Sequence, residues 1–162
     1  MGDDGKQVVL EYYERLNRHD LAGAEELFSE DCAVAVADSE LDRRAYMALL
    51  DSWLTGFPDL RNTVEEIVAE EHTVAVRSTW EGTHQAAFEG IPSTGRQVRY
   101  SSFSFSRVEG GRITERRLVA NLFGVLQQLG DLSFRTPLKP QQPERDLAKD
   151  VSAAFRATPG AE

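Results

Sequence analysis

Two consecutive stretches near the end of the sequence alternate polar and apolar residues. "SFSFSRV" (102–108) brings Phe103, Phe105 and Arg107 to one side of an extended chain, and "ERRLVAN" (115–121) does the same for Arg117 and Asn121. Arg offers five N–H donors and Asn an amide, but neither takes up a proton at neutral pH. Such side chains donate hydrogen bonds to ligand oxygens. We expect one of these two sides to face the interior.

The same residues also have ordinary structural explanations. Arg107 and Arg117 each have a glutamate two residues away, so both suit solvated ion pairs. Asn121 directly precedes "LFGVLQQLG" (122–130), which has the apolar pattern of a short helix, and Asn is a preferred N-cap. The local sequence leaves these alternatives open.

Composition and motif content argue against several functional classes. A net charge of -9 disfavours a nucleic-acid partner. His19, His72 and His84 are far apart and no CxxC or HxxxH spacing occurs, so we predict no metal site. GxGxxG, P-loop and GxSxG motifs are absent, which argues against a bound nucleotide or a hydrolase triad.

Several features favour a cytoplasmic protein. The lone Cys32 lies within the apolar stretch "CAVAVA" (32–37) and is predicted to be a small buried residue, as suits a reducing compartment. No apolar run approaches the roughly 20 residues that cross a bilayer, and the N-terminus lacks an apolar signal segment.

A helical first part and a β-rich second part must position these residues. Apolar residues recur at helical spacing in 6–17, 21–28 and 42–60, with Asp20 as a cap before the second helix and one short strand at 32–37. The period then changes to two in 62–71, in 72–84 and in two long stretches that meet at "EGGR" (109–112). Helices followed by a long-stranded antiparallel sheet define the α+β class. A sheet curled around the helices would enclose a pocket.

Five short motifs follow one another in the order and spacing of the SnoaL-like polyketide cyclase family. They are "FPDL" (57–60), "GTH" (82–84), "GIPSTGR" (90–96), "VEGGRITE" (108–115) and "GVLQQLG" (124–130). The resemblance covers about residues 6–132. It implies a cone-shaped α+β barrel of the nuclear-transport-factor-2-like (NTF2-like) class, with N-terminal helices packed in a curved, mainly antiparallel sheet. It also implies an enzyme that acts on polycyclic aromatic polyketides without a cofactor of its own.

The resemblance further implies a change of chemistry at the site. Ring-closing cyclases of this family keep an acid/base aspartate at the position of Asn121, and a histidine near the end of the penultimate strand, where Arg107 is the candidate replacement. Asn and Arg can hold a phenolate or dihydroquinone anion, which reacts with dioxygen. The expected activity is therefore hydroxylation of an anthracycline-type ring, with Asn121 and Arg107 as catalytic residues and a separate NAD(P)H-dependent reductase as partner.

Two other functions remain open. In an intramolecular aldol cyclase, Asp59 or Asp38 would move the proton, since burial can raise a carboxyl pKa, although Asp59 also suits a turn. A non-catalytic domain would simply bind a flat aromatic ligand. The candidate substrate-binding residues, most of which also suit a plain core, are Tyr46, Trp53, Trp80, His84, Phe103 and Phe105.

Two segments are predicted to differ in character. Residues 1–135 are expected to form the barrel domain. Residues 136–162 hold four of the six prolines and are expected to be a C-terminal tail, partly disordered or with a short helix. Because proteins of this fold commonly pair through their sheet faces, we expect a homodimer.

Overall fold

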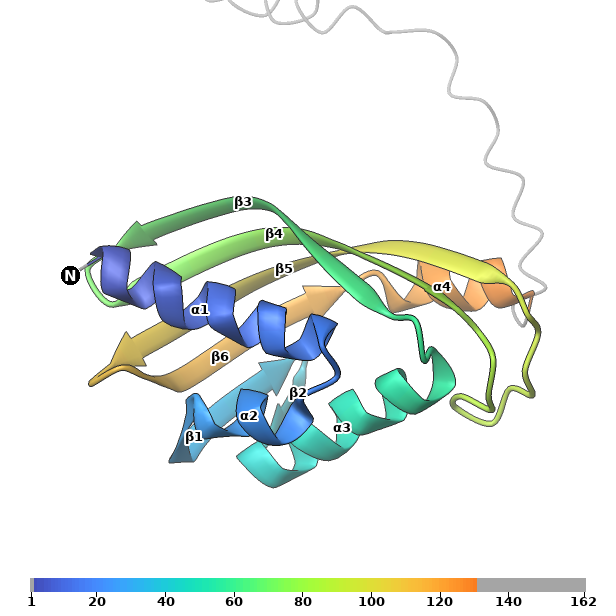
Figure 1. Cartoon of the computed structure of the whole chain (residues 1–162), viewed down its shortest axis with the longest axis horizontal. Coiled ribbons are helices and arrows are strands. Elements are labelled where there is room, and N and C mark those ends of the chain that lie inside the picture. The colour runs from blue at the N-terminus through green and yellow to red at the C-terminus, as the bar shows by residue number, and fades with distance from the viewer. Residues whose placement is uncertain (1, 131–162) are drawn as a thin grey trace, which may run out of the picture. The chain divides into compact units, whose positions relative to one another are not determined.

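The computed structural model describes residues 2–130, in which a curved six-stranded sheet wraps around three helices, and a fourth helix lies at its end (Figure 1). In chain order the elements are α1 (Gly2–Asn17), α2 (Leu21–Glu26), β1 (Phe28–Val36), β2 (Ser39–Leu41), α3 (Arg43–Gly56), β3 (Arg61–Glu70), β4 (Thr73–Thr83), β5 (Gln97–Glu109), β6 (Arg112–Ala120) and α4 (Leu122–Leu129). The strand order is β2-β1-β6-β5-β4-β3, so the sheet stays unclosed, and only β1 and β6 pair in parallel. The predicted α+β class with a curved, mainly antiparallel sheet is confirmed.

Capping side chains set where the helices begin. Asp20 accepts a hydrogen bond from the Gly23 N–H at 2.9 Å, as predicted, and Asp42 accepts one from the Ala45 N–H at 2.7 Å. The predicted helix over 21–28 is two residues too long, because Phe28 already belongs to β1 and is fully buried. The three-residue strand β2 was missed, since it is too short and exposed to show a pattern.

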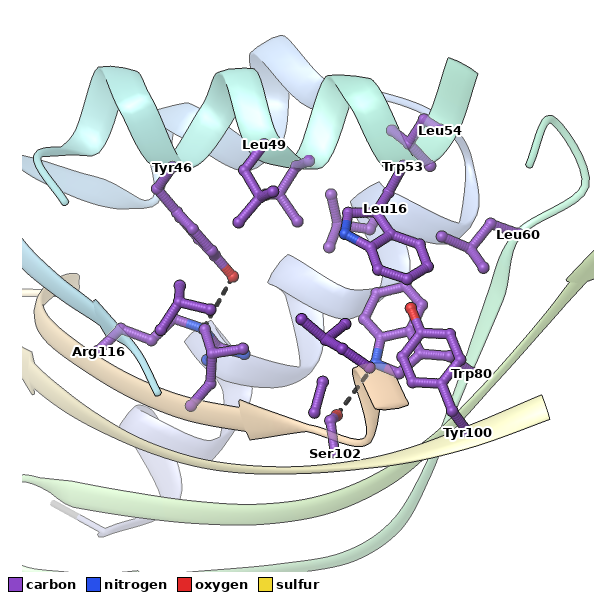
Figure 2. Close-up of a pocket in the computed structure, with 15 residues that line it drawn as sticks. Leu16, Tyr46, Leu49, Trp53, Leu54, Leu60, Trp80, Tyr100, Ser102 and Arg116 are labelled. Carbon is purple, nitrogen blue, oxygen red and sulfur yellow. Dashed lines mark hydrogen bonds between the residues drawn. The ribbon is translucent and has the colours of Figure 1, made fainter. Parts of the chain in front are cut away.

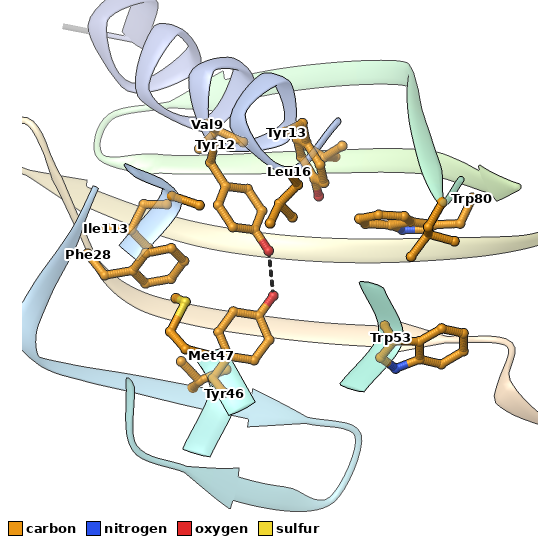
Figure 3. Packing of buried hydrophobic residues seen from close by; sticks show 14 of the residues in the cluster. Val9, Tyr12, Tyr13, Leu16, Phe28, Tyr46, Met47, Trp53, Trp80 and Ile113 are labelled. Carbon is orange, nitrogen blue, oxygen red and sulfur yellow. Dashed lines mark hydrogen bonds between the residues drawn. The ribbon is translucent and has the colours of Figure 1, made fainter. Parts of the chain in front are cut away.

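The core lies between the inner face of the sheet and the helices α1 and α3 (Figure 3). α1 buries one side, whose members recur at helical spacing: Val9, Tyr12, Tyr13 and Leu16. The Tyr12 ring packs edge-on against Phe28 at 5.4 Å between ring centroids. Each such side chain stabilises the fold by about 1.5–3 kcal/mol through removal of apolar surface from water.

The middle of β5 reverses the usual pattern, in which apolar side chains face inward. Its inner face carries Ser102, Ser104 and Ser106, while Phe103 and Phe105 stay 55% and 59% exposed on the outer face. The inner serines are satisfied by buried polar partners from other elements, so they can lie inside. The side with the phenylalanines therefore faces outward, although either this side or the matching side of β6 was expected to face the interior.

The matching side of β6 also faces outward. Arg107 forms an ion pair with Glu109 at 2.8 Å, and Arg117 one with Glu115 at 2.6 Å, on the outer face. Both arginines therefore have the solvated pairing that was the alternative explanation. Arg116, between Glu115 and Arg117, points inward instead.

No helix within residues 2–130 is long and apolar enough to cross a membrane. The predicted tail at 136–162 lies outside the described residues, and the domain boundary stays a prediction.

Candidate functional site

An apolar cavity of about 80 Å³ lies between α3 and the inner face of β5 and β6 (Figure 2). Leucines from α1, α3 and the α3–β3 turn form much of its wall. The lining side chains that carry polar atoms are Tyr46, Trp53, Trp80, Tyr100, Ser102 and Arg116. We call this space the inner cavity.

A wider cleft of about 650 Å³ lies beside the inner cavity. The two spaces share four lining residues, namely Val36, Leu49, Trp53 and Leu122, so they are direct neighbours. Pockets for drug-sized molecules measure roughly 300–1,000 Å³. The cleft is therefore large enough for a fused ring system, and it adjoins the inner cavity.

Arg116 supplies a buried positive charge to the inner cavity. It is 3% exposed and donates to three hydroxyl oxygens, those of Tyr46 at 3.2 Å, Ser106 at 2.7 Å and Tyr13 at 2.8 Å. Its guanidinium carbon also lies 4.7 Å from the ring centroid of Tyr12. None of the ion pairs formed within residues 2–130 includes Arg116.

The hydrogen-bond partners of this guanidinium within residues 2–130 are hydroxyl groups, and none is a carboxylate. A guanidinium stays protonated in proteins, and burial raises the pKa of Tyr12, so that hydroxyl keeps its proton at neutral pH. An opposite charge interacts more strongly with a cation in a dry cavity than in water. The inner end of the cavity is therefore suited to an anionic oxygen of a ligand.

No proton acceptor of ordinary acid/base type lines the inner cavity among residues 2–130. Its lining contains no Asp, Glu or His, and the adjoining cleft has only the exposed Glu89. Burial raises the pKa of the Cys32 thiol to about 11, as suits a core side chain rather than a nucleophile. The same part of the chain has no group of three or more side chains that could hold a metal ion.

The model of the SnoaL-like polyketide cyclase family matches residues 6–129. This chain belongs to that family. No curated protein matches it. Among solved structures, AclR from Streptomyces galilaeus, a candidate hydroxylase, is 33% identical with a TM-score of 0.78, over 82% of this chain and 99% of AclR. IdmH from Streptomyces antibioticus, a candidate polyketide cyclase, is 30% identical with a TM-score of 0.70, over 78% of this chain and 98% of IdmH.

A third structure extends the likeness of fold. A candidate SnoaL-like polyketide cyclase from Jannaschia sp. CCS1 has a TM-score of 0.74 at 18% identity, over 81% of this chain and 94% of that one. The NTF2-like cone fold is thus confirmed, and the protein is an enzyme of the SnoaL-like cyclase or hydroxylase type.

Within this SnoaL-like fold, three of the predicted substrate-binding residues meet at the inner cavity. Tyr46 and Trp53 reach it from α3, and Trp80 from β4 (Figure 2). Trp80 donates its Nε1–H to Ser102 at 3.0 Å, which fixes the orientation of the indole.

The other predicted aromatic and cationic residues lie elsewhere. Phe103, Phe105 and Arg107 are on the outer face of the sheet, so they cannot contact a ligand in the cavity. His84 is fully buried but lines neither the cavity nor the cleft; its Nδ1 lies 3.0 Å from the Thr94 hydroxyl and its ring stacks on a phenylalanine. His84 therefore holds the loop that follows β4 rather than a ligand.

Asn121 caps α4. Its Oδ1 accepts the Gly124 N–H at 2.9 Å, and its side chain is exposed. Its chain neighbours Ala120 and Leu122 both line the inner cavity, whereas Asn121 itself is not among the lining residues. The capping explanation is confirmed, and a catalytic role stays a prediction.

Neither candidate acid/base aspartate reaches the cavity. Asp59 is exposed and accepts from Thr83 twice, from the N–H at 2.6 Å and the hydroxyl at 2.7 Å. Slight burial raises the pKa of Asp59, but these two bonds outweigh it and leave the pKa below its ordinary value. Asp38 is exposed in the turn between β1 and β2. The geometry contradicts both as buried acids.

Sequence reasoning missed Arg116. The available signal was the phase of β5: Val98, Tyr100 and Val108 share a parity with the serines and not with the phenylalanines. Assigning these three apolar residues to the inner face would have placed the serines on the inner face as well. A bulge in the β5–β6 pairing between Arg107 and Val108 then decides which arginine of β6 faces them.

Proposed function

We propose that this SnoaL-like protein is a cofactor-free tailoring enzyme that hydroxylates a ring of an anthracycline-type aromatic polyketide, with a separate NAD(P)H-dependent reductase as partner. The observation that carries the proposal is the buried guanidinium of Arg116: among residues 2–130 it has no carboxylate partner, and the inner cavity that these residues form has no Asp, Glu or His in its lining. Aldol ring closure needs a group that exchanges a proton, whereas stabilising an anion needs only donors. The likeness to AclR supports the same choice.

The chemistry balances without a cofactor on the protein. The reductase converts a ring quinone to a dihydroquinone, whose anion is stabilised at Arg116. Dioxygen then reacts with the electron-rich ring: one oxygen atom becomes the new ring hydroxyl and the other leaves as water. The two electrons for that water come from the dihydroquinone, which returns to the quinone.

In this proposal Arg116 takes the role that the sequence assigned to Arg107. Asn121 stays a candidate between two residues that line the cavity; its Oδ1 is used by the cap, and its amide N–H groups can still donate. Asn121→Asp tests this: a gain of ring-closing activity supports a catalytic position, and no effect on either activity leaves Asn121 as a cap alone.

Labelled dioxygen tests the proposal directly. The protein is incubated with an anthracyclinone, a quinone reductase and NADPH under ¹⁸O₂. We expect one labelled hydroxyl per product molecule and loss of labelling in Arg116→Met. Unlabelled or unchanged product contradicts the proposal. Ring closure of an open methyl-ester precursor without oxygen or reductant would favour the cyclase alternative, to which the likeness to IdmH points. Binding without either turnover would favour a ligand-binding domain.

We also propose that the enzyme is a homodimer joined through the outer face of the sheet. Phe103 and Val119 lie opposite each other on β5 and β6, and with Phe105 they form a patch whose members are each more than half exposed. Light scattering tests this. A Phe103→Glu, Phe105→Glu variant should be monomeric where the unmodified protein is dimeric, and an unchanged mass would contradict the assignment of this face.

A further inference from the structure

The hydroxyl of Tyr46 has two close partners. It lies 2.7 Å from the hydroxyl of Tyr12 (Figure 3) and accepts the Nε–H of Arg116 at 3.2 Å (Figure 2). Tyr46 lines the inner cavity, whereas Tyr12 is fully buried and does not. Only one of the two hydroxyls can donate in the hydrogen bond between them, so the hydrogen of the other hydroxyl is free to point elsewhere.

The direction of that bond follows from which of the two residues lines the cavity. If Tyr46 donated to Tyr12, the Tyr12 hydrogen would be enclosed without an acceptor, because Tyr46 is its sole hydrogen-bond partner within residues 2–130. A buried donor without a partner costs about 1–3 kcal/mol. If Tyr12 donates instead, the Tyr46 oxygen receives two donors and its own hydrogen is left for the cavity.

We infer that Tyr46 is the residue that donates a hydrogen bond to the substrate, at the oxygen that carries negative charge. Arg116 and Tyr12 act behind it as positioning residues. This rests on the proposed function in one respect, namely that the ligand is an aromatic ring bearing an oxygen atom at its inner edge.

The same arrangement explains how one hydroxyl can serve an anion. Two donors, one of them cationic, draw electron density from the Tyr46 oxygen and so strengthen the bond that its own O–H makes. The positive charge of Arg116 thereby acts on the ligand through Tyr46. Because the site has no carboxylate among its lining residues, no competing anion opposes the ligand there.

Ligand affinity tests the inference without any turnover. Alizarin, a dihydroxyanthraquinone, and phenanthrene, which has three fused rings and no oxygen, are titrated separately while the fluorescence of Trp53 and Trp80 is followed. Air-free buffer without reductant excludes oxygenation. In Tyr46→Phe we expect the Kd of alizarin to rise about 5- to 20-fold, as for one lost hydrogen bond, while that of phenanthrene stays within about twofold.

Two further variants make the test decisive. Tyr13→Phe removes a hydroxyl from the same guanidinium but not from the cavity lining, so the ratio of the two Kd values should hold within about twofold. Tyr12→Phe removes a donor to Tyr46 and should leave alizarin binding equal or weaker. If Tyr46 donated to Tyr12, this change would free the Tyr46 proton, and alizarin would bind more tightly.

Three results would overturn the inference: an equal loss for both ligands in Tyr46→Phe, no loss for alizarin, or tighter alizarin binding in Tyr12→Phe. The result is independent of the labelling experiment. If the product lacks ¹⁸O but the affinity ratios are as expected, the hydroxylase proposal is refuted and Tyr46 remains the donor. If the product carries ¹⁸O but the affinity ratios are not as expected, only the assignment of Tyr46 as the donor is refuted.

Discussion

Replacing Arg116 by Met should cost little stability and much ligand affinity. The change removes three hydrogen bonds from a charged donor, at about 1.5 kcal/mol each, and about 1 kcal/mol of cation–π attraction. It also removes the penalty for burying an unpaired charge, which is several kcal/mol. Because these contributions nearly cancel, we expect the free energy of unfolding to change by less than about 2 kcal/mol.

Urea unfolding at pH 7 measures the stability, and fluorescence titration with alizarin measures the affinity. With the charge gone, the Kd of alizarin should rise at least about tenfold, since one charge-assisted interaction exceeds about 1.4 kcal/mol. Arg18→Met is the matched control: Arg18 is exposed in the turn that follows α1, and its side chain has only a 3.4 Å contact to Glu14. It should change neither quantity by more than about 0.5 kcal/mol.

The reasoning about Arg116 would be refuted by the opposite pattern. A loss of more than about 4 kcal/mol with unchanged alizarin affinity would mean that the guanidinium serves the fold and not the ligand.

Two other side chains have separable structural effects. Asn121→Ala should lower the free energy of unfolding by about 1 kcal/mol through loss of the α4 cap, whereas Asn121→Asp keeps the cap and should stay within about 0.5 kcal/mol; equal melting temperatures for the two variants would contradict this. Asp59 has a folded-state pKa below its ordinary value of 3.8, so its stabilising contribution is present above that pH and is lost as the pH falls through the folded-state pKa. Asp59→Asn should therefore destabilise the protein at pH 7, with the difference from the unmodified protein shrinking below about pH 4, and a pH-independent difference in urea unfolding would speak against this explanation.

Local patterns were enough to predict most elements. α1 and α3 follow from apolar residues at helical spacing, and the turn between β5 and β6 follows from Gly110 and Gly111, whose φ angles of 57° and 75° suit glycine. The start of α2 was predictable from Asp20, because its capping bond joins it to Gly23, only three residues further along the chain. In each case the deciding interactions lie within a few residues along the chain.

The site could not be predicted in the same way, because its contacts are long-range. In the middle of β5 the rule that apolar residues face inward fails, since Ser104 and Ser106 form hydrogen bonds with polar partners 91 and 10 residues away. Likewise, which residue of the pair Arg116 and Arg117 turns inward depends on a bulge in the pairing with β5 and on Tyr13 in α1. Neither the bulge nor the contact with Tyr13 can be recognised from the residues next to Arg116 in the sequence.

The central claim is that the inner cavity stabilises an anionic oxygen through Arg116 and Tyr46. The most direct test is an absorption titration of alizarin bound to excess protein, because its visible spectrum reports ionisation of its hydroxyl. A plain apolar cavity would raise the pKa of the bound dye, whereas a nearby cation lowers it. We predict that the bound hydroxyl ionises about one pH unit or more below its value in water. Ionisation at an unchanged or higher pH would contradict the account.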